Sequence, residues 1–347
     1  MASNYEYINA RLRGQHPRLL RAKDYDELMS LPDLAALARW FETSHYSSDW
    51  QLAKVRHAGL EAIEEALEAN FGAATAKLLA MADGQPRQFI GLLLRRWDLA
   101  NIKAVARGIH QGWQSAEVGR SLWPAGSFDA ARLRELAQQP DLRGLADTLA
   151  TWGDGLAEPL SQSLAEYQQR RDIARVEAAL DRHYYREALR QLRGLGRNCR
   201  VLRAIVRQEI DLANAKAARR LFDKGDLGGL NPGDLFIDGG QRLDATTYGA
   251  LFDHRTKHRT LTSLKGAPFH GLLTQAEPGW QEEGWLERGL AAELARLYHQ
   301  DPLSIDLVIG FLWQKFYEVV NLRLLARAKV FGLPSEQLRT ELFLFVP

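Results

Sequence analysis

The sequence predicts an all-α protein built from three similar helical units. Three observations support this prediction. Apolar residues recur every three or four positions along most of the chain, which is the spacing of one helix face. Alternating strand-like runs are scarce, and Leu and Ala, which favour helices, outnumber Val and Ile. A polar motif also occurs three times at nearly regular separations.

The helical spacing is clearest near the two ends of the chain. It includes Leu28, Leu31, Leu34, Leu37 and Trp40, then Leu60, Ile63 and Leu67, and finally Phe311, Lys315, Val319, Leu322 and Leu325. Proline followed by an acidic or hydroxyl side chain is typical of a helix start. We therefore expect helices to begin at Pro32–Asp33, Pro140–Asp141 and Pro334–Ser335.

Two segments rich in Gly and Pro interrupt the helical pattern, at residues 111–128 and 225–240. We interpret them as connections and predict three units, residues 1–115, 116–230 and 231–347. The first two units share a pattern: residues 27–38 align without gaps on residues 135–146, and both segments contain Leu-x-x-x-Pro-Asp-Leu. Such similarity indicates related units stacked beside one another.

The repeated motif is acid-x-x-Asn-x-base-x-x-x-Arg. Its three copies consist of Asp98, Asn101, Lys103 and Arg107; Asp211, Asn214, Lys216 and Arg220; and Glu318, Asn321, Arg323 and Arg327. On a helix the acid and the Asn are neighbours, and the two basic residues lie one turn apart beyond an apolar strip.

Two interpretations of this motif are open. Asn is mildly unfavourable inside a helix, so its threefold use predicts an amide with a fixed hydrogen-bond partner in each unit. The motif would then be an internal polar network that clamps its helix to a neighbour. Alternatively, the basic pairs form a row that faces a binding partner. Both hold if the network positions the surface that is used.

A second pattern is a run of arginines spaced three or four residues apart. It comprises Arg182, Arg186, Arg190, Arg193, Arg197, Arg200, Arg203 and Arg207. If the backbone stays helical past Gly194 and Gly196, these side chains form a continuous basic stripe able to bind an acidic protein face, anionic lipid headgroups or a phosphate backbone. Otherwise they form a solvated face, with some arginines paired to the acids around Glu177, Asp181 and Glu187.

Composition and motifs exclude several other classes of protein. The chain has 347 residues and a formal charge of +2, with 45 basic and 43 acidic side chains, so we do not expect a nucleic-acid-coating protein. Its single cysteine, Cys199, cannot form an internal disulfide. A phosphate-binding GxxxxGK[ST] loop, a GxSxG elbow and an HExxH motif are all absent from the sequence. We therefore predict no catalytic residue, no cofactor and no metal site.

Four segments resemble one protein family. They are YEYINARLRG (residues 5–14), Thr43-Ser-His-Tyr46, WDLANIKAVARG (residues 97–108) and the long segment from Pro302 to Arg339. These segments are similar to signatures of the C subunit of the archaeal and bacterial V-type (A-type) ATP synthases, the counterpart of the d subunit of eukaryotic vacuolar ATPases. The resemblance runs from end to end and is weakest at residues 225–284.

The resemblance implies a funnel-like body of three helical bundles in a pseudo-threefold arrangement. It also implies a non-catalytic central-stalk subunit that couples a membrane ring of proteolipid subunits to the shaft made by subunits D and F, for rotary proton or sodium transport. Contact with the membrane stator subunit is a further implied possibility. The chain would lie at the cytoplasmic face of the membrane, attached through its partners only, and would bind no nucleic acid. On this interpretation the motif bases make the funnel lining positive for an acidic shaft or ring surface.

Two other classes of function remain as alternatives. One is a free-standing helical scaffold that binds nucleic acid or anionic membrane through the arginine stripe, and salt-sensitive binding by the purified chain would favour it. The other is an unrecognised helical enzyme, which intrinsic turnover by the isolated chain would support.

Overall fold

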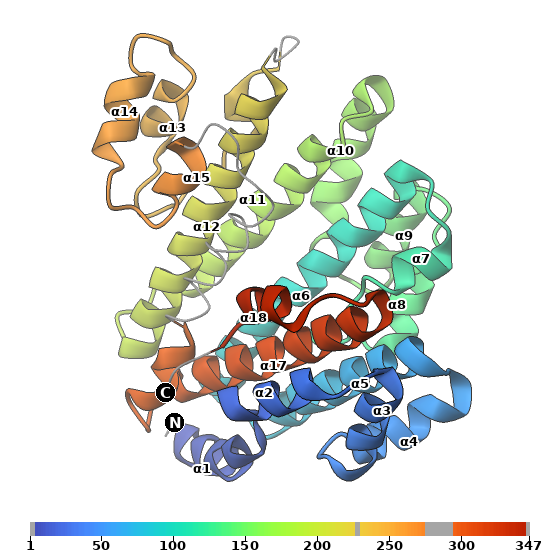
Figure 1. Ribbon diagram of the computed structural model, residues 1–347. Helices are drawn as coiled ribbons and strands as arrows, with labels where there is room; N and C mark the ends of the chain where they lie inside the picture. Colours follow the sequence, from blue (N-terminus) through green and yellow to red (C-terminus); the bar gives the residue numbers. More distant parts are fainter. Residues whose placement is uncertain (1–3, 226–229, 275–293, 345–347) are drawn as a thin grey trace. The chain divides into compact units, whose positions relative to one another are not determined.

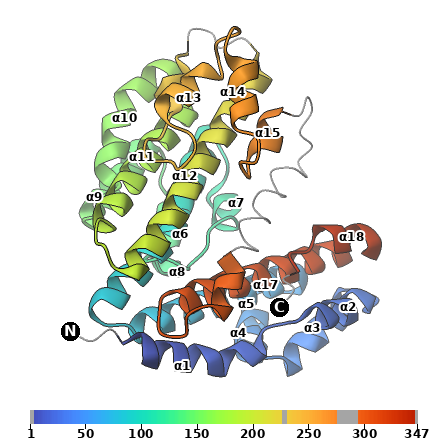
Figure 2. The same ribbon diagram turned by 90° about the vertical axis from the view of Figure 1, so that its left-hand side faces the viewer.

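The regular elements of the protein are helices. A computed structural model describes residues 4–225, 230–274 and 294–344, and no strand occurs in those ranges (Figures 1 and 2). The predicted all-α class is therefore confirmed. Part of the predicted connection at residues 225–240, namely residues 226–229, lies outside the described residues.

The helices differ widely in length, from single turns to 28 residues. In the first third of the chain they are α1 (Tyr5–Gln15), η1 (His16–Arg18), α2 (Ala22–Ser30), α3 (Leu34–Thr43), α4 (Ser47–Arg56), α5 (Gly59–Ala80) and α6 (Gly84–Gln111). The middle contains α7 (Ser115–Gly119), α8 (Ala130–Ala137), α9 (Leu142–Thr151), α10 (Ala157–Arg170), α11 (Ile173–Gln191) and α12 (Arg197–Lys224). The rest contains η2 (Pro232–Leu235), α13 (Ala245–Ala250), α14 (Lys257–Ser263), α15 (His270–Thr274), η3 (Leu297–His299), α17 (Asp306–Phe331) and α18 (Ser335–Glu341).

The chain divides into two compact units. The first comprises Met1–Asp98, Trp123–Ala130 and Leu290–Pro347, and the second comprises Leu99–Leu122 and Ala131–Gly289. The boundary falls inside α6, so the two halves of this helix pack in different units. This division follows contact density and does not test the predicted boundaries at residues 115 and 230, which remain a prediction.

In the first unit the long helices α5 and α17 lie side by side, and α1, α3 and η3 pack on α17 (Figures 1 and 2). An aromatic cluster fills the space beside them. The Phe316 ring lies 5.4 to 5.6 Å from the rings of Phe71, Trp97 and Trp123. Burial of these large apolar surfaces is the main force that holds the helices of this unit together.

In the second unit α10 packs between α9 and α11, and α11 packs on α12. The short elements η2, α13, α14 and α15 share a core with the C-terminal half of α12. Tyr248, Leu251 and Leu264 belong to this core and are at most 5% exposed. None of the described helices is both long and apolar enough to cross a membrane.

The predicted helix starts are confirmed. Asp33 and Asp141 are N-caps with nearly the same backbone angles, and their carboxylates accept hydrogen bonds from the backbone N–H of Ala36 and Gly144. The helices that follow them, α3 and α9, each contain ten residues. An Asp oxygen that accepts from the third residue satisfies a backbone donor that the helix leaves free. The predicted start at Pro334 is the N-cap of α18.

Candidate functional site

The three motif copies lie on the three longest helices of the described chain, α6, α12 and α17. The number of residues from the motif acid to the end of the helix is the same in all three helices, which end at Gln111, Lys224 and Phe331. The next residue is in each case a glycine with positive φ, namely Gly112 at 70°, Gly225 at 67° and Gly332 at 68°. Positive φ is strained for residues with a Cβ and common for glycine after a helix. The three helices therefore share one register, from the acid to the terminating glycine.

The first two acids each hold a loop that follows about thirty residues later. The carboxylate of Asp98 accepts from the backbone N–H of Ser127 at 2.9 Å and of Phe128 at 3.2 Å. In the second copy Asp211 accepts from the backbone N–H of Arg242 at 2.8 Å and of Leu243 at 3.0 Å. Both carboxyl groups are buried. Burial raises the pKa of each, and the hydrogen bonds from the loop oppose that rise.

A glycine in each loop makes this close approach possible. A Cβ built on Gly126 would lie 2.0 Å from Asp98 Oδ1, and one built on Gly240 would lie 2.2 Å from Asp211 Oδ1. Because neither distance is compatible with a real carbon atom, only glycine fits at these two positions without rearrangement.

The motif amides of the second and third copies bind a distant backbone in the same way. Asn214 donates to the carbonyl of Ile237 at 2.8 Å and accepts from its N–H at 2.8 Å. Asn321 makes the same two bonds with Phe343, at 2.9 and 2.8 Å. Asn101 in the first copy is also buried. Such a bidentate contact satisfies both backbone groups of its partner residue; Ile237 is buried and Phe343 is partly buried.

The third acid, Glu318, binds the N-terminal segments instead of a later loop. It accepts from Leu20 N–H at 2.6 Å and Tyr46 Oη at 2.5 Å, and Lys315 Nζ lies at 2.8 Å. Burial raises the pKa of Glu318, but the charge of Lys315 and the hydrogen bond from His45 outweigh burial and lower the pKa to about 2. The carboxylate is therefore an ionised centre inside the first unit.

The motif bases of the first and third copies have carboxylate partners within the chain. On α6, Lys103 pairs with Asp181 at 2.7 Å and Arg107 pairs with Glu177. On α17, Arg323 pairs with Glu68 at 2.5 Å and Arg327 pairs with Glu64 at 2.7 Å. In both cases the two acids lie one turn apart on a helix that runs antiparallel to the motif helix. Along the sequence, Glu177 and Asp181 of α11 follow Glu64 and Glu68 of α5 by the same number of residues as the second motif follows the first.

These ion pairs cross the predicted unit boundaries. Lys103 belongs to the predicted first unit and Asp181 to the second, whereas Arg323 belongs to the predicted third unit and Glu68 to the first. The motif helix of one predicted unit is thus joined to the long helix of another, and the third predicted unit is joined back to the first. Four of the motif bases are neutralised by the chain itself, so their contact with a partner protein stays a prediction.

The arginines of the predicted stripe do not lie on one continuous helix, because α11 ends at Gln191 and α12 begins at Arg197. The condition for a continuous stripe, a helical backbone past Gly194 and Gly196, is therefore not met. Arg203 donates to the carbonyls of Leu192 and Gly194 in the break, and these bonds replace helical bonds that the glycine-rich turn lacks.

Other arginines of the predicted stripe have partners on the chain. Arg182 donates to the carbonyl of Asp234, Arg190 pairs with Glu187, Arg200 donates to the carbonyl of Leu195 and Arg207 donates to the carbonyl of Gly240. Binding of a partner by the eight arginines remains an untested prediction. Within the described ranges no three His, Cys, Asp or Glu side chains converge to form a metal site.

Several of these residues were not identified from the sequence. From the sequence, Glu177 and Asp181 were considered only as partners of the stripe arginines, and Gly240 only as part of a turn. The terminating glycines, Gly126 and the acids of α5 had no assigned role. A signal for the acid pairs was present in the sequence. The number of residues from Glu64 and Glu68 to Glu177 and Asp181 equals the number of residues from the first motif to the second.

A comparison with protein families matches residues 8–341 of the chain to the ATP synthase (C/AC39) subunit. The chain belongs to this family. The family resemblance of the four segments is thereby confirmed. Similar proteins include the C subunit of the V-type ATP synthase of Thermus thermophilus, 31% identical over 98% of this chain and 99% of that protein. The C subunit of the A-type ATP synthase of Haloferax volcanii is 30% identical over 98% and 97%, and that of the V-type ATP synthase of Deinococcus radiodurans is 29% identical over 98% and 92%.

Proposed function

We propose that the chain is the non-catalytic coupling subunit of the central stalk in a V/A-type ATP synthase or ATPase. It joins the proteolipid rotor ring to the shaft subunits D and F at the cytoplasmic face of the membrane, and contact with the stator subunit is part of the same proposal. The observation that carries the proposal is the match of residues 8–341 to this family, together with long helices joined from one predicted unit to another.

A coupling subunit must transmit torque without shearing between its parts. Buried polar ties resist shear because breaking one leaves a buried group without a partner. The bidentate contacts of Asn214 and Asn321 and the four ion pairs of α6 and α17 are polar ties between distant parts of the chain. The ties of Asn214, Lys103 and Arg323 are largely buried, whereas Arg107 and Arg327 are about half exposed. These ties connect residues 22 to 263 positions apart in the chain.

The shared register of α6, α12 and α17 supports the proposed arrangement of three similar bundles around a funnel. Equivalent helices of equal register are the elements that such a pseudo-threefold body would repeat. In this proposal the lining of the funnel is built from these helices, and the more exposed bases, Arg107, Arg220 and Arg327, meet an acidic surface of the shaft or the ring.

The proposal is tested by affinity purification of the tagged chain from detergent-solubilised membranes. We expect the proteolipid ring and the large nucleotide-binding subunits to be recovered with it. Recovery of the chain alone contradicts the assembly role, and ATP turnover by the isolated chain contradicts the non-catalytic role. Salt-sensitive binding of the isolated chain to DNA or anionic liposomes, without recovery of the complex, supports the scaffold alternative instead.

A further inference from the structure

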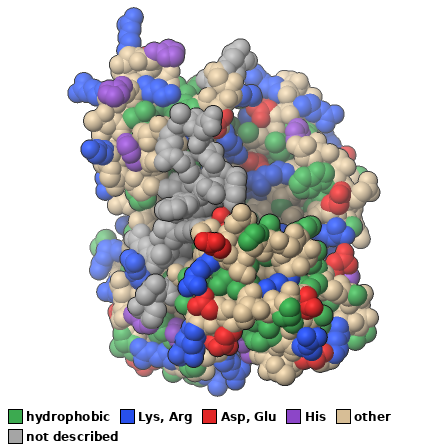
Figure 3. Space-filling model, viewed as in Figure 1, with side chains coloured by type: hydrophobic (Ala, Val, Ile, Leu, Met, Phe, Trp, Pro, Cys, Tyr) green, Lys and Arg blue, Asp and Glu red, His purple; other side chains and the backbone are tan. Residues whose placement is uncertain are grey.

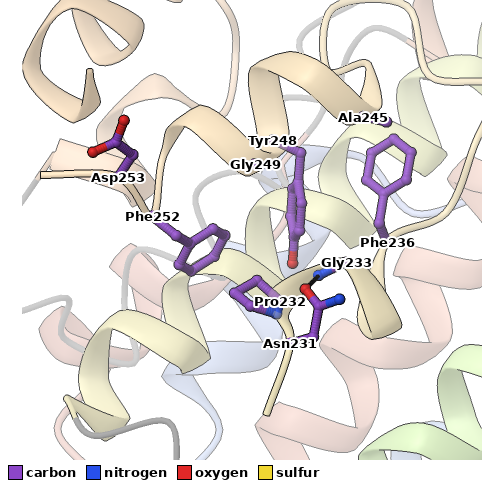
Figure 4. A pocket seen from close by; sticks show the side chains of 9 residues that line it. All are labelled: Asn231, Pro232, Gly233, Phe236, Ala245, Tyr248, Gly249, Phe252 and Asp253. Carbon is purple, nitrogen blue, oxygen red and sulfur yellow. Dashed lines mark hydrogen bonds between the residues drawn. The ribbon is translucent and has the colours of Figure 1, made fainter. Parts of the chain in front are cut away.

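A pocket opens between η2 and α13 in the second unit. Its volume is about 370 Å³, and Figure 4 shows the side chains that line it. The rings of Phe236, Tyr248 and Phe252 form its walls, with Pro232 and Asn231 on the side of η2. Adjacent rings in this row are 5.1 and 5.4 Å apart. The pocket is large enough for one or two side chains. Because its lining is mostly apolar, an apolar side chain fits it better than water does.

The Tyr248 side chain is a buried hydrogen-bonding group without a partner. Tyr248 is 1% exposed, and no described residue forms a hydrogen bond with its hydroxyl. Figure 4 shows the ring between Phe236 and Phe252, with the hydroxyl directed toward Pro232 and Gly233. A hydroxyl removed from water without a partner destabilises the fold. The Tyr248 hydroxyl lies beneath the surface of the pocket, so a bound segment would contact the ring and not this atom.

Two other described helices, α3 and α9, begin with an aspartate cap as α13 does, but neither has a buried hydroxyl at the position of Tyr248. The capping residues Asp33, Asp141 and Asp244 each accept from the N–H three residues later. The side chain four residues after the cap is Leu37 in α3 and Leu145 in α9, both fully buried, whereas it is Tyr248 in α13.

The third helix of this set is also shorter. α3 and α9 have ten residues each, and α13 has six. Eight residues after the cap, Phe41 and Leu149 are fully buried, whereas the corresponding Phe252 is only half-buried and lines the pocket. The short α13 thus leaves open a space that its counterparts fill, and a tyrosine hydroxyl replaces a leucine methyl group beside that space.

The surface next to the pocket is basic. Residues 254–274 contain four Lys or Arg and three His side chains and no Asp or Glu. Figure 3 shows these basic and histidine side chains gathered over α13 and α14. Arg255, Arg259 and Lys265 are exposed, and within the described part of the chain no carboxylate pairs with them. The one acid on the rim, Asp253, accepts from the backbone N–H of Arg255 at 3.0 Å.

We propose that this pocket and α14 form a docking site for an acidic polypeptide segment of another subunit. An aromatic or branched apolar side chain of the segment enters the pocket and packs against the rings of Phe236, Tyr248 and Phe252. Acidic residues of the segment meet Arg255 and Arg259. A lipid headgroup or a phosphate backbone uses the positive charge but leaves the aromatic pocket unfilled, which is why a polypeptide fits better. The inference rests on the proposed function, since the partner is a component of that assembly.

The test begins with a substitution that fills the pocket. Gly249 lines the pocket, and a Cβ built there meets no atom within 4 Å. Gly249→Phe therefore places a ring in the open space without a clash at Cβ. Gly14 in α1 has equally free surroundings, so Gly14→Phe is the matched control. The full-length variants are added to detergent-solubilised complex from cells that lack this subunit, and the affinity for re-incorporation is measured.

We expect Gly249→Phe to weaken re-incorporation about tenfold or more, as loss of a buried anchor does, and Gly14→Phe to leave it unchanged. Tyr248→Phe, which keeps the ring and removes only the buried hydroxyl, should leave it nearly unchanged. Arg255→Glu with Arg259→Glu should weaken it and steepen its salt dependence. The control Arg134→Glu with Arg143→Glu removes two exposed arginines of α8 and α9, and should have little effect.

Hydrogen exchange separates this inference from the proposed function. In the assembled complex we expect residues 231–264 to exchange more slowly than in the isolated chain. Normal incorporation of Gly249→Phe, with no protection of residues 231–264, overturns the docking site and leaves the proposed function intact. Failure of the unmodified chain to join the complex overturns both. Binding of the isolated chain to anionic vesicles that is unchanged by Gly249→Phe and abolished by the Arg255 and Arg259 reversals identifies a lipid surface and also overturns the docking site.

Discussion

Arg327 Nε lies 2.7 Å from Glu64 Oε1, and this ion pair joins the end of α17 to the start of α5 across 263 positions of the chain. Its counterpart is the pair of Arg107 with Glu177, which joins the end of α6 to the start of α11. Pairs of this kind bind one predicted unit to another. We therefore expect the predicted units to depend on each other for stability.

The more buried pair of Arg323 with Glu68 tests that dependence. Arg323 is 8% exposed and also lies over the Trp123 ring at 4.1 Å. Burial raises the pKa of Glu68 to about 7, so the measurement belongs at a pH above that value, where the carboxylate is ionised. Glu68→Ala leaves a buried charge without its partner, and we expect the free energy of unfolding in urea to fall by about 2–4 kcal/mol.

Two further variants check the origin of that loss. Replacing both partners, Glu68→Leu with Arg323→Met, should recover most of the stability, because no unpaired charge remains. The exposed pair of Lys54 with Glu42, at 3.6 Å, is a control whose removal should cost under about 1 kcal/mol. Equal losses from the buried and the exposed pair would show that the α17–α5 pair has no special role.

The bidentate amide contacts should contribute to stability by a different route. Asn214→Leu keeps the volume of the side chain but leaves the buried N–H and C=O of Ile237 without partners. We expect a loss of roughly 2–4 kcal/mol in urea unfolding, and a smaller loss for Asn321→Leu, because Phe343 is only partly buried and water can reach its backbone groups. Gln168→Leu, at an exposed position of α10, is the control. A loss below about 0.5 kcal/mol for Asn214→Leu would mean that water satisfies these backbone groups.

The loop glycines predict a steric effect. Gly240→Ala would place a methyl carbon 2.2 Å from Asp211 Oδ1 and 3.0 Å from the Leu243 carbonyl, so the loop must move away from the acid. We expect at least about 2 kcal/mol of destabilisation. Gly91→Ala in α6 meets no atom within 4 Å and should instead stabilise the protein by about 0.5–1 kcal/mol. Thermal unfolding of the two variants side by side measures the difference, and equal behaviour contradicts the close approach.

The ionised centre at Glu318 predicts a dependence on pH. Its pKa falls from the ordinary value of 4.5 to about 2 in the folded protein. A lowered carboxyl pKa stabilises the fold above pH 4.5, and this stabilisation is lost as pH falls toward 2, because the unfolded chain then binds the proton first. The full effect is on the order of 3 kcal/mol.

We therefore expect unfolding free energies to fall between pH 4.5 and 2 more steeply in the unmodified protein than in Glu318→Gln. The variant should be less stable at neutral pH. Because residue 318 no longer titrates in it, its stability should change less between pH 4.5 and 2. Urea titrations at a series of pH values measure both. Parallel curves for the two proteins would show that Glu318 does not hold a lowered pKa.

The motif bases provide a test of the proposed partner surface. Arg107 and Arg220 are among the more exposed of them. Reversing both, as Arg107→Glu with Arg220→Glu, should loosen the assembled complex and make it dissociate at lower salt, because an acidic partner surface would be repelled. The far-ultraviolet circular dichroism and urea midpoint of the double variant establish that it is folded. Unchanged assembly by a folded double variant contradicts the proposed contact of these bases with a partner.

Much of the fold follows from local patterns in the sequence. The helical class, the starts of α3, α9 and α18, and the three motif copies were predicted from residues within a few turns of one another. Such features depend on backbone capping and on which face of a helix is apolar, and neighbouring residues determine both. The family was also predicted from short segments of the sequence.

The partners of the motif residues were decided only by the tertiary structure. Nothing near Lys103 in sequence indicates Asp181, which is 78 positions away, and nothing near Tyr248 indicates that its hydroxyl is buried without a partner. The sequence leaves open whether the arginine spacing belongs to one continuous helix; the structure breaks the helix between Gln191 and Arg197 and satisfies carbonyls of the break with Arg203. Local sequence determines whether a segment is helical, whereas packing between segments distant in the chain determines which polar groups meet, because that pairing depends on how the whole core excludes water.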